Sequence, residues 1–380
     1  MLACRWAGLL TCWLIGRLIT GLPSLPHFLF TLRVFDNAIR SVAKSLQARG
    51  ETQEALHQRA LEASHSRFGR NVFIRAVVEA SNFCRENCVY CGMRRDNRSL
   101  DRFRARHDQL AELLVHHRPA AVTDVNIQTG EDPRAVREVV IPLIETLRRE
   151  TNLGVSVCLG TLNAALYDEL QAAGASVYII KFEVAGERLY AQSKAPGTLQ
   201  ERTGHIRLLA ERGWKVSSGF IAGLPGQTER DLLESLALAR QLPLAGCSVS
   251  PFIPGESTPL STAPTADINL TLNCMALLRL MQPEWVIPAV SALNLAEAGS
   301  GYRRGLRTGA NLVTINLTPA DLREDYLLYK RDRYIMTEER ILSAIDAEGL
   351  VPSTQSLAEF YRGKATGRFE ESAPAEVAAV

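Results

Sequence analysis

The sequence predicts an α/β fold, a (β/α)8 barrel with an N-terminal helical lead. Strand-like and amphipathic helical segments alternate and form eight strand–helix units within about 250 residues, as such a barrel requires. In addition, polar residues gather on one face of several of these strands. A doubly wound open sheet would produce the same alternation, so it remains an alternative at this point.

The elements follow one another in a regular order. Apolar positions at helical spacing predict lead helices over 35–49 and 53–66. Strand-like runs lie at 72–81, 122–130, 154–160, 176–186, 214–223, 247–255, 285–292 and 311–319. Helical candidates between them are 108–116, 134–150, 163–173, 201–212, 229–240 and 269–281. We assign 35–70 to the lead and 71–350 to the barrel, and we expect 351–380 to be a largely disordered tail.

The inner face of the barrel is predicted to be polar. The residues that share one face of their strand are Asp124, Asn126 and Gln128, then Lys181 and Glu183, then Ser248 and Ser250, and finally Thr314, Asn316 and Thr318. Helices cover the outside of such a barrel, so the outer strand face must be apolar and the polar set must point inward. A dry barrel is filled by branched aliphatic side chains. This lumen is therefore expected to hold a polar ligand and water.

Composition restricts the class of protein. The net charge is +2, from 43 basic and 41 acidic residues, so we expect neither a nucleic-acid partner nor stable membrane association. Five of the eight cysteines are scattered singly, which disfavours a disulfide-stapled secreted domain. The three clustered thiols favour a reducing compartment, and we expect a cytoplasmic location.

The first 34 residues form a separate apolar extension. The run 6–16 lies between Arg5 and Arg17 and resembles the core of a signal peptide, although it is too short to span a bilayer comfortably. A segment that packs on the protein, or a start codon assigned too far upstream, is favoured over export.

Cys84, Cys88 and Cys91 form a C-x3-C-x2-C pattern at the end of the first predicted strand, where barrel active sites lie. Thiolates at this spacing can converge on one soft metal centre. A closed zinc site takes four ligands, and the next histidine, His107, stands alone. Three thiolates on a [4Fe–4S] cluster leave one iron open to a cofactor's own donor atoms. We therefore predict such a cluster in preference to zinc or a redox disulfide. Export of the chain is disfavoured for the same reason, because export of an iron–sulfur enzyme by an unfolded route would be costly.

The segment "NFCRENCVYC", with Tyr90 before its last cysteine, resembles the radical S-adenosylmethionine (SAM) superfamily, whose motif is C-x3-C-x-aromatic-C. In that superfamily the amino and carboxylate groups of SAM chelate the fourth iron, and reductive cleavage of the sulfonium produces a 5′-deoxyadenosyl radical. The resemblance implies an enzyme with one [4Fe–4S] cluster and SAM as cofactors. It also implies a one-electron donor such as ferredoxin or flavodoxin.

Other motifs fit the same resemblance. The turn "TGED" (129–132) is similar to the one that binds the SAM amino group, and "FIAGLPGQT" (220–228) is similar to the motif along the adenine. Glu183 and Arg202 resemble residues that hold the ribose or methionyl end. The resemblance implies these cofactor-binding residues: Tyr90, Gln128, Thr129, Gly130, Glu131, Asp132, Glu183, Arg202, Ala222, Gly223 and Leu224.

Within the superfamily the chain resembles the branch of biotin synthase, methylornithine synthase and the HydE-type maturase of [FeFe]-hydrogenase. The HydE type is the most similar, through "IRAVVEASNFCRENCVYCGMRRDN", "PFIPGESTPL" and "GANLVTINLTP". It implies a role in hydrogenase maturation on a small metal complex. No cysteine follows Cys274, so we expect a single cluster; Cys158 alone does not suit the second cluster of biotin synthase. The segment 314–336 differs from the HydE pattern, so a HydE-like enzyme with another substrate and a mutase like methylornithine synthase both remain open.

The substrate is described only by its chemistry. Arg304 and Arg307 could clamp a carboxylate or another anion, although a solvated helix end explains them equally well. The neutral donors and acceptors expected in the substrate site are Ser250, Ser291, Thr314, Asn316 and Thr318. We expect a small anionic or zwitterionic substrate, such as an amino acid or a metal–amino acid complex. A non-catalytic scaffold that carries zinc or a cluster is the rival from another class.

Overall fold

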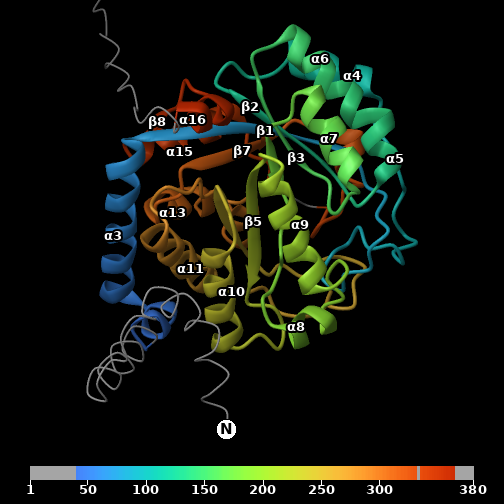
Figure 1. The fold of residues 1–380 in the computed structure, drawn as a ribbon. Helices are drawn as coiled ribbons and strands as arrows, with labels where there is room; N and C mark the ends of the chain where they lie inside the picture. The colour runs from blue at the N-terminus through green and yellow to red at the C-terminus, as the bar shows by residue number, and fades with distance from the viewer. Residues whose placement is uncertain (1–39, 332–333, 364–380) are drawn as a thin grey trace, which may run out of the picture. The chain divides into compact units, whose positions relative to one another are not determined.

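The computed structural model describes residues 40–331 and 334–363 (Figure 1). The chain divides into two compact units, Met1–Lys44 and Ser45–Val380. Of the first unit, residues 40–44 are described and are helical. The apolar extension 1–34 and the first part of the helix predicted over 35–49 lie outside the described residues. The strands among the described residues all belong to the second unit.

The strands are β1 (Asn71–Ser81), β2 (Asp124–Thr129), β3 (Gly154–Cys158), β4 (Val177–Ile179), β5 (Lys215–Ala222), β6 (Gly246–Pro251), β7 (Leu312–Asn316) and β8 (Val351–Pro352). The longer helices are α3 (Gly50–Phe68), α4 (His107–His116), α6 (Ile141–Glu150), α7 (Ala164–Ala173), α9 (Leu199–Glu211), α10 (Glu229–Gln241), α11 (Ile268–Met281) and α15 (Glu338–Ala347). Shorter helical pieces are α5 (Pro133–Ala135), the π-helix η1 (Val136–Val140), α8 (Glu187–Gln192), α12 (Ala292–Ala296), α13 (Gly301–Arg307), α14 (Ala320–Arg323) and α16 (Leu357–Gly363).

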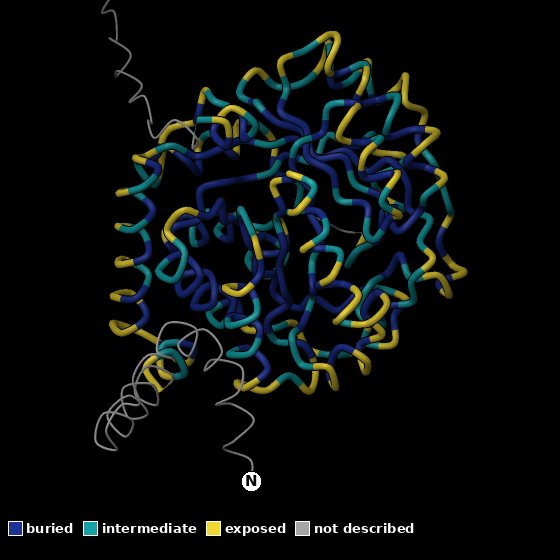
Figure 2. The backbone as a smooth tube through the Cα atoms, viewed as in Figure 1, coloured by how far each residue is buried: buried dark blue, intermediate teal, exposed yellow. Residues whose placement is uncertain are grey.

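Seven strands form one curled parallel sheet in the order β6-β5-β4-β3-β2-β1-β7. Strands that follow one another in sequence are neighbours in space, and the helices between them lie outside the sheet (Figure 1). This arrangement confirms the barrel and excludes the doubly wound sheet, in which the strand order reverses. Figure 2 shows the strands as buried backbone, with the exposed positions on the surrounding helices and loops.

The segment predicted as a strand over 285–292 occupies the position between β6 and β7 but is irregular. Val286 forms a single parallel bridge with Gly246 of β6, and Pro288 forms one with Leu312 of β7. The Ala289 amide also donates to the Leu312 carbonyl at 2.8 Å. Pro288 has no amide hydrogen to donate, and this interrupts a regular hydrogen-bond ladder. The segment thus links the two ends of the sheet without forming a full strand.

Residues 351–363 are ordered, so the expectation of a disordered tail from 351 onward is wrong for this part. β8 pairs with the start of β1, through Asn71↔Val351 and Val72↔Pro352. Leu357, Phe360 and Tyr361 on α16 are buried in one apolar cluster with residues of α3, β1 and β7. Their spacing of three and four places them on one helix face, and burial of that face holds the helix on the barrel. Residues 364–380 lie outside the described part.

The lead helix predicted over 53–66 is present as α3, which packs against α11. Between them, the Gln53 side-chain amide donates to Asn273 Oδ1 at 2.8 Å. Among the described residues, no helix is both long and apolar enough to cross a membrane.

Candidate functional site

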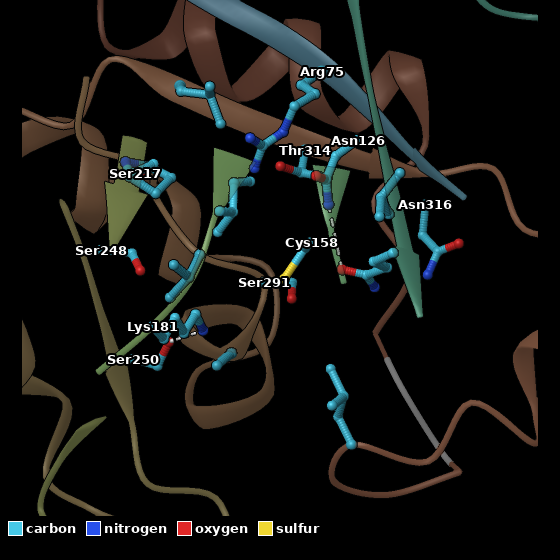
Figure 3. Close-up of a pocket in the computed structure, with 18 of the residues that line it drawn as sticks. Arg75, Asn126, Cys158, Lys181, Ser217, Ser248, Ser250, Ser291, Thr314 and Asn316 are labelled. Atoms are coloured by element: carbon cyan, nitrogen blue, oxygen red, sulfur yellow. Dashed lines mark hydrogen bonds between the residues drawn. The ribbon is translucent and has the colours of Figure 1, made fainter. Parts of the chain in front are cut away.

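A cavity of about 300 Å³ lies within the barrel, lined by inward-facing strand residues (Figure 3). Strand parity therefore predicted the polar lumen correctly. The expected residues that line the cavity are Gln128, Thr129, Glu183, Arg202, Ser250, Ser291, Thr314 and Asn316. Asn126, Lys181 and Ser248 line it as well. A polar cavity of this size can hold small molecules that make several hydrogen bonds.

A hydrogen-bonded network crosses the wall of this cavity. Asn316 Nδ2 donates to Glu79 Oε1 at 3.0 Å, and Gln128 Nε2 donates to the same oxygen at 3.4 Å. Asn126 Nδ2 in turn donates to Gln128 Oε1 at 3.4 Å. Three adjacent strands, β2, β1 and β7, thus carry one chain of side-chain contacts that fixes the orientation of the amides toward the cavity.

Two charged residues of β1, Arg75 and Glu79, also line the cavity and were not predicted from the sequence. The signal was available, because both interrupt the apolar run 72–81 and their spacing of four places them on the same strand face. The three tyrosines Tyr326, Tyr329 and Tyr334 also line the cavity, from a segment without regular strands. Strand parity could not find these, since their position depends on the path of a loop.

Lys181 and Glu183 follow β4 and face the cavity together. Lys181 Nζ lies 3.4 Å from Ser250 Oγ. Burial raises the pKa of Glu183, and the nearby charges of Lys181 and Arg202 oppose this rise. The backbone of Glu183 has φ 63°, which is unusual for a residue with a Cβ, and it is held by hydrogen bonds to Gly219 and Ile221 of β5. Such strain is concentrated at functional positions.

The three cysteines lie on the loop after β1. Cys88 is buried, whereas Cys84 and Cys91 are partly buried. Burial raises the pKa of Cys84 and Cys88 and raises that of Cys91 to about 12. The charges of the neighbouring thiolates raise the pKa of Cys88 and Cys91 further. A cationic centre that binds all three thiolates would remove this penalty.

The three thiols of this loop are the ligand type that holds iron–sulfur clusters in proteins. The Glu131 amide also donates to Cys84 Sγ at 3.4 Å, the kind of hydrogen bond that tunes cluster sulfurs.

The turn after β2 braces the cysteine loop. Glu131 Oε1 accepts from Arg202 at 2.9 Å, and its Oε2 accepts from Arg85 at 3.1 Å. Asp132 accepts from Arg104 at 2.8 and 3.0 Å and from Ser81 Oγ at 2.7 Å. Both carboxylates are therefore already paired. Arg202 faces the cavity as well, and its Nε donates to the Lys181 carbonyl at 2.8 Å.

The remaining expected SAM contacts lie beside the cavity. The Tyr90 ring packs against an apolar cluster that contains Tyr190, Ile221, Leu224 and Phe252. Ala222 ends β5, and Gly223 follows it with φ 84°. The amides of Gly223 and Leu224 both donate to Gln227 Oε1, at 2.6 and 3.3 Å. Neither these residues nor Tyr90 belong to the cavity lining.

The expected arginine clamp is wrong. Arg304 binds Glu297 and Asn269, and Arg307 binds Glu348 at 2.5 Å; neither arginine lines the cavity. Helix α13 turns Tyr302 toward the lumen, where its hydroxyl donates to the Thr314 carbonyl at 2.9 Å. The arginines of the same helix therefore lie on other faces.

Thr318 is also misplaced as a substrate residue. Its hydroxyl oxygen accepts a hydrogen bond from the Glu79 amide at 2.9 Å, and its side chain is not part of the cavity lining. β7 ends at Asn316, so the strict alternation that puts Thr314 and Asn316 inward does not extend to Thr318.

Comparison with known proteins identifies the class. Residues 78–239 match the model of the Radical SAM superfamily. The "[FeFe] hydrogenase maturase subunit HydE" of Thermotoga maritima is 33% identical over 297 residues, which cover 78% of this chain and 84% of that protein. The "3-methylornithine synthase" of Methanosarcina acetivorans is 26% identical over 314 residues, 80% of this chain and 87% of that protein.

Among solved structures, methylornithine synthase (PylB) superimposes with a TM-score of 0.75 at 24% identity, covering 86% of this chain and 96% of that one, which shows a shared fold. The cysteine loop, the polar lumen and these matches agree with one another. The chain belongs to the radical SAM superfamily, whose enzymes use a [4Fe–4S] cluster and S-adenosylmethionine.

Proposed function

We propose that this enzyme is a HydE-like maturase, which acts on a small polar substrate in the barrel lumen during assembly of an [FeFe] hydrogenase. The observation that carries the proposal is the 33% identity to a HydE subunit over 84% of that protein's length. The cavity within the barrel supports it, because polar side chains from several strands line it and a small substrate held there would be largely surrounded by protein.

Cys84, Cys88 and Cys91 are the proposed cluster ligands. When bound, the reduced cluster and SAM supply a 5′-deoxyadenosyl radical. Gln128 and Thr129 end β2, and Gly130 follows them beside the cysteine loop; we assign these three residues to the methionyl part of SAM. Glu131 and Asp132 hold this turn through their arginine partners.

Glu183 and Arg202 face the cavity from the neighbouring strand and helix, and we assign them to the polar groups of SAM. We assign Tyr90, Ala222, Gly223 and Leu224 to the adenine ring; Tyr90 and Leu224 belong to one apolar cluster. Ser250, Ser291, Thr314 and Asn316 remain for the substrate. A ferredoxin or flavodoxin is the proposed source of the electron.

The test is anaerobic reconstitution followed by two assays. With dithionite as reductant, the protein is expected to cleave SAM to 5′-deoxyadenosine. In a defined maturation mixture that lacks only HydE, adding the protein should restore hydrogenase activity. Cleavage without restored hydrogenase activity would remove the maturase assignment and leave the radical chemistry intact. Bound zinc without cleavage would instead support the non-catalytic scaffold.

The alternative is an amino-acid mutase like methylornithine synthase. It is favoured by 26% identity over 87% of a 3-methylornithine synthase. The two candidate functions are distinguished by the products that the enzyme forms. Formation of 3-methylornithine from an amino-acid panel, together with no effect in the maturation mixture, would favour the mutase.

A further inference from the structure

Arg75 is a cation inside the barrel whose Nε finds no partner. It projects from β1 into the cavity, on the side of Thr314 and Asn126 (Figure 3). Its Nε is fully buried and has no hydrogen-bond partner, and no carboxylate among the described residues lies within ion-pair distance of its guanidinium. A buried charge in this situation is costly unless an anion or polar groups compensate it.

The other cations of the cavity wall are already engaged. Arg202 forms an ion pair with Glu131 at 2.9 Å. Lys181 contacts Ser250 and lies close enough to Glu183 for that carboxylate to raise its pKa. Among the described cations of the cavity wall, Arg75 is thus the one with a buried N–H group that has no hydrogen-bond partner.

The carboxylate that is nearest to Arg75 in the strand register already has other hydrogen-bond partners. Asp124 of β2 stands beside Arg75 in the parallel ladder. Both of its oxygens accept from the Leu357 amide, at 3.0 Å each, and one accepts from Thr123 Oγ1 at 2.9 Å. Gly154 makes room for this carboxylate, since a Cβ there would lie 2.0 Å from Asp124 Oδ1. Asp124 thus caps the start of α16 and offsets the charge of Arg75 only at longer range.

We propose that Arg75 binds the carboxylate of the substrate at the floor of the lumen, with Thr314 and Asn126 as neutral partners. The inference rests on the proposed function only in taking the lumen as the substrate site. A guanidinium presents a planar pair of N–H groups that matches a carboxylate in two parallel hydrogen bonds. Thr314 is the register partner of Arg75 on β7, and Asn126 lies one layer higher on β2.

The position of Arg75 also orients the substrate. Glu79 lies on the same strand face four residues closer to the cysteine loop, about 13 Å along the strand. A carboxylate held at Arg75 is thus at the far end from the cysteines, and the other end of the molecule points toward them. The cavity of about 300 Å³ limits the substrate to a molecule of amino-acid size.

The experiment measures binding to the reconstituted holoenzyme without SAM or reductant, so that it does not depend on turnover. The probes are L-2-aminobutyrate and its amide, which share their shape and amine and differ in the carboxylate charge. We expect wild type to bind the acid at least tenfold more tightly than the amide, by calorimetry. Arg75→Gln should remove this preference, and Arg75→Lys should retain part of it. Arg307→Gln, a surface arginine paired with Glu348, is the matched control and should keep the preference.

Melting temperature and cluster absorbance check that each variant is folded and loaded. Equal binding of acid and amide by wild type would overturn the proposal without any variant, as would an unchanged preference in a folded Arg75→Gln protein. If the preference is present while SAM is not cleaved, the radical function fails and the anion site stands. If SAM is cleaved and the preference is absent, the anion site alone fails.

Discussion

At the scale of single residues, the site depends on groups buried in protonation states that differ from those in water. The thiols of Cys84, Cys88 and Cys91 all have raised pKa values because they are buried near one another. Burial likewise raises the pKa of the Asp124 carboxyl group, to about 7. Each group is held in place by backbone or side-chain donors, so its environment can be altered by one substitution.

Cys88→Ala is expected to abolish cluster binding and SAM cleavage while the barrel stays folded, because a thiolate ligand is lost and the packing change is small. Absorbance of the reconstituted protein, iron content and 5′-deoxyadenosine yield measure the loss. Cys274→Ala is the control, since Cys274 is buried in α11 away from the cysteine loop and should keep its cluster. Full cleavage by Cys88→Ala would overturn the ligand assignment.

Asp124 predicts a pH dependence of stability. Its folded pKa of about 7 lies above the value of an unfolded aspartate, so the native state binds more protons between about pH 4 and pH 7. The contribution of Asp124 to stability therefore falls as pH rises through this window. Relative to wild type, Asp124→Asn should become more stable from pH 5 to pH 8, by about 3 kcal/mol at most. Urea unfolding at several pH values measures this difference; a pH-independent difference would contradict the raised pKa.

At the scale of elements, short segments rather than whole strands position the chemistry. The turn after β2 meets the cysteine loop so closely that a Cβ on Gly130 would lie 2.2 Å from the Phe83 carbonyl oxygen and 2.7 Å from Cys84 Cβ. At the opposite end of the barrel, α16 closes the floor with Leu357 and Tyr361, which also line the cavity. The strands that precede these segments, β2 and β8, both pair with β1, the strand that carries Arg75 and Glu79.

Gly130→Ala should displace the cysteine loop and reduce iron content after reconstitution, because the added methyl group would meet the backbone of Phe83 rather than a flexible side chain. The strain is of the order of 1–3 kcal/mol. Gly204→Ala is the matched control: it lies within α9 with nothing within 4 Å of the added Cβ, and should raise stability by about 0.5–1 kcal/mol. Normal iron content in Gly130→Ala would show that the turn does not brace the loop.

The packing of α16 yields a separate prediction. Phe360 is buried among residues of α3 and β1, so Phe360→Ala should cost about 3–5 kcal/mol in the free energy of unfolding. Val351→Ala removes an apolar side chain that is 44% exposed and should change stability by less than about 0.5 kcal/mol. Equal effects of the two substitutions would mean that α16 does not pack as described.

At the scale of the whole molecule, the barrel separates two environments along one axis. The cysteine loop lies where β1 ends, and α16 lies where β1 begins. The cavity lies between these two ends, with Leu357 and Tyr361 of α16 in its lining. The irregular segment at 285–291 contributes Ser291 to this interior while it links β6 and β7.

The molecule is expected to carry one cluster. The only closely spaced cysteines in the sequence are the three between residues 84 and 91, and none follows Cys274. Reconstitution should therefore load about four irons per chain, the content of one [4Fe–4S] cluster. Iron analysis of folded protein tests this, with Cys88→Ala as the blank. About eight irons per chain would require a second site.

The sequence by itself determined the barrel, the polar lumen, the cysteine triad and the superfamily, because these depend on local periodicity and on spacing within one segment. Strand parity placed Asn126, Gln128, Thr314 and Asn316 correctly, since side-chain direction alternates wherever a strand is regular. The tertiary structure alone decided that Arg304 and Arg307 stay outside the lumen, because they lie on a short helix whose orientation depends on the packing of Tyr302. The inward direction of Arg75, by contrast, follows from the strand face that it shares with Glu79. The sequence also could not show which charged groups of the site are already paired. Glu131 and Asp124 find their partners 71 and 233 residues away in the chain.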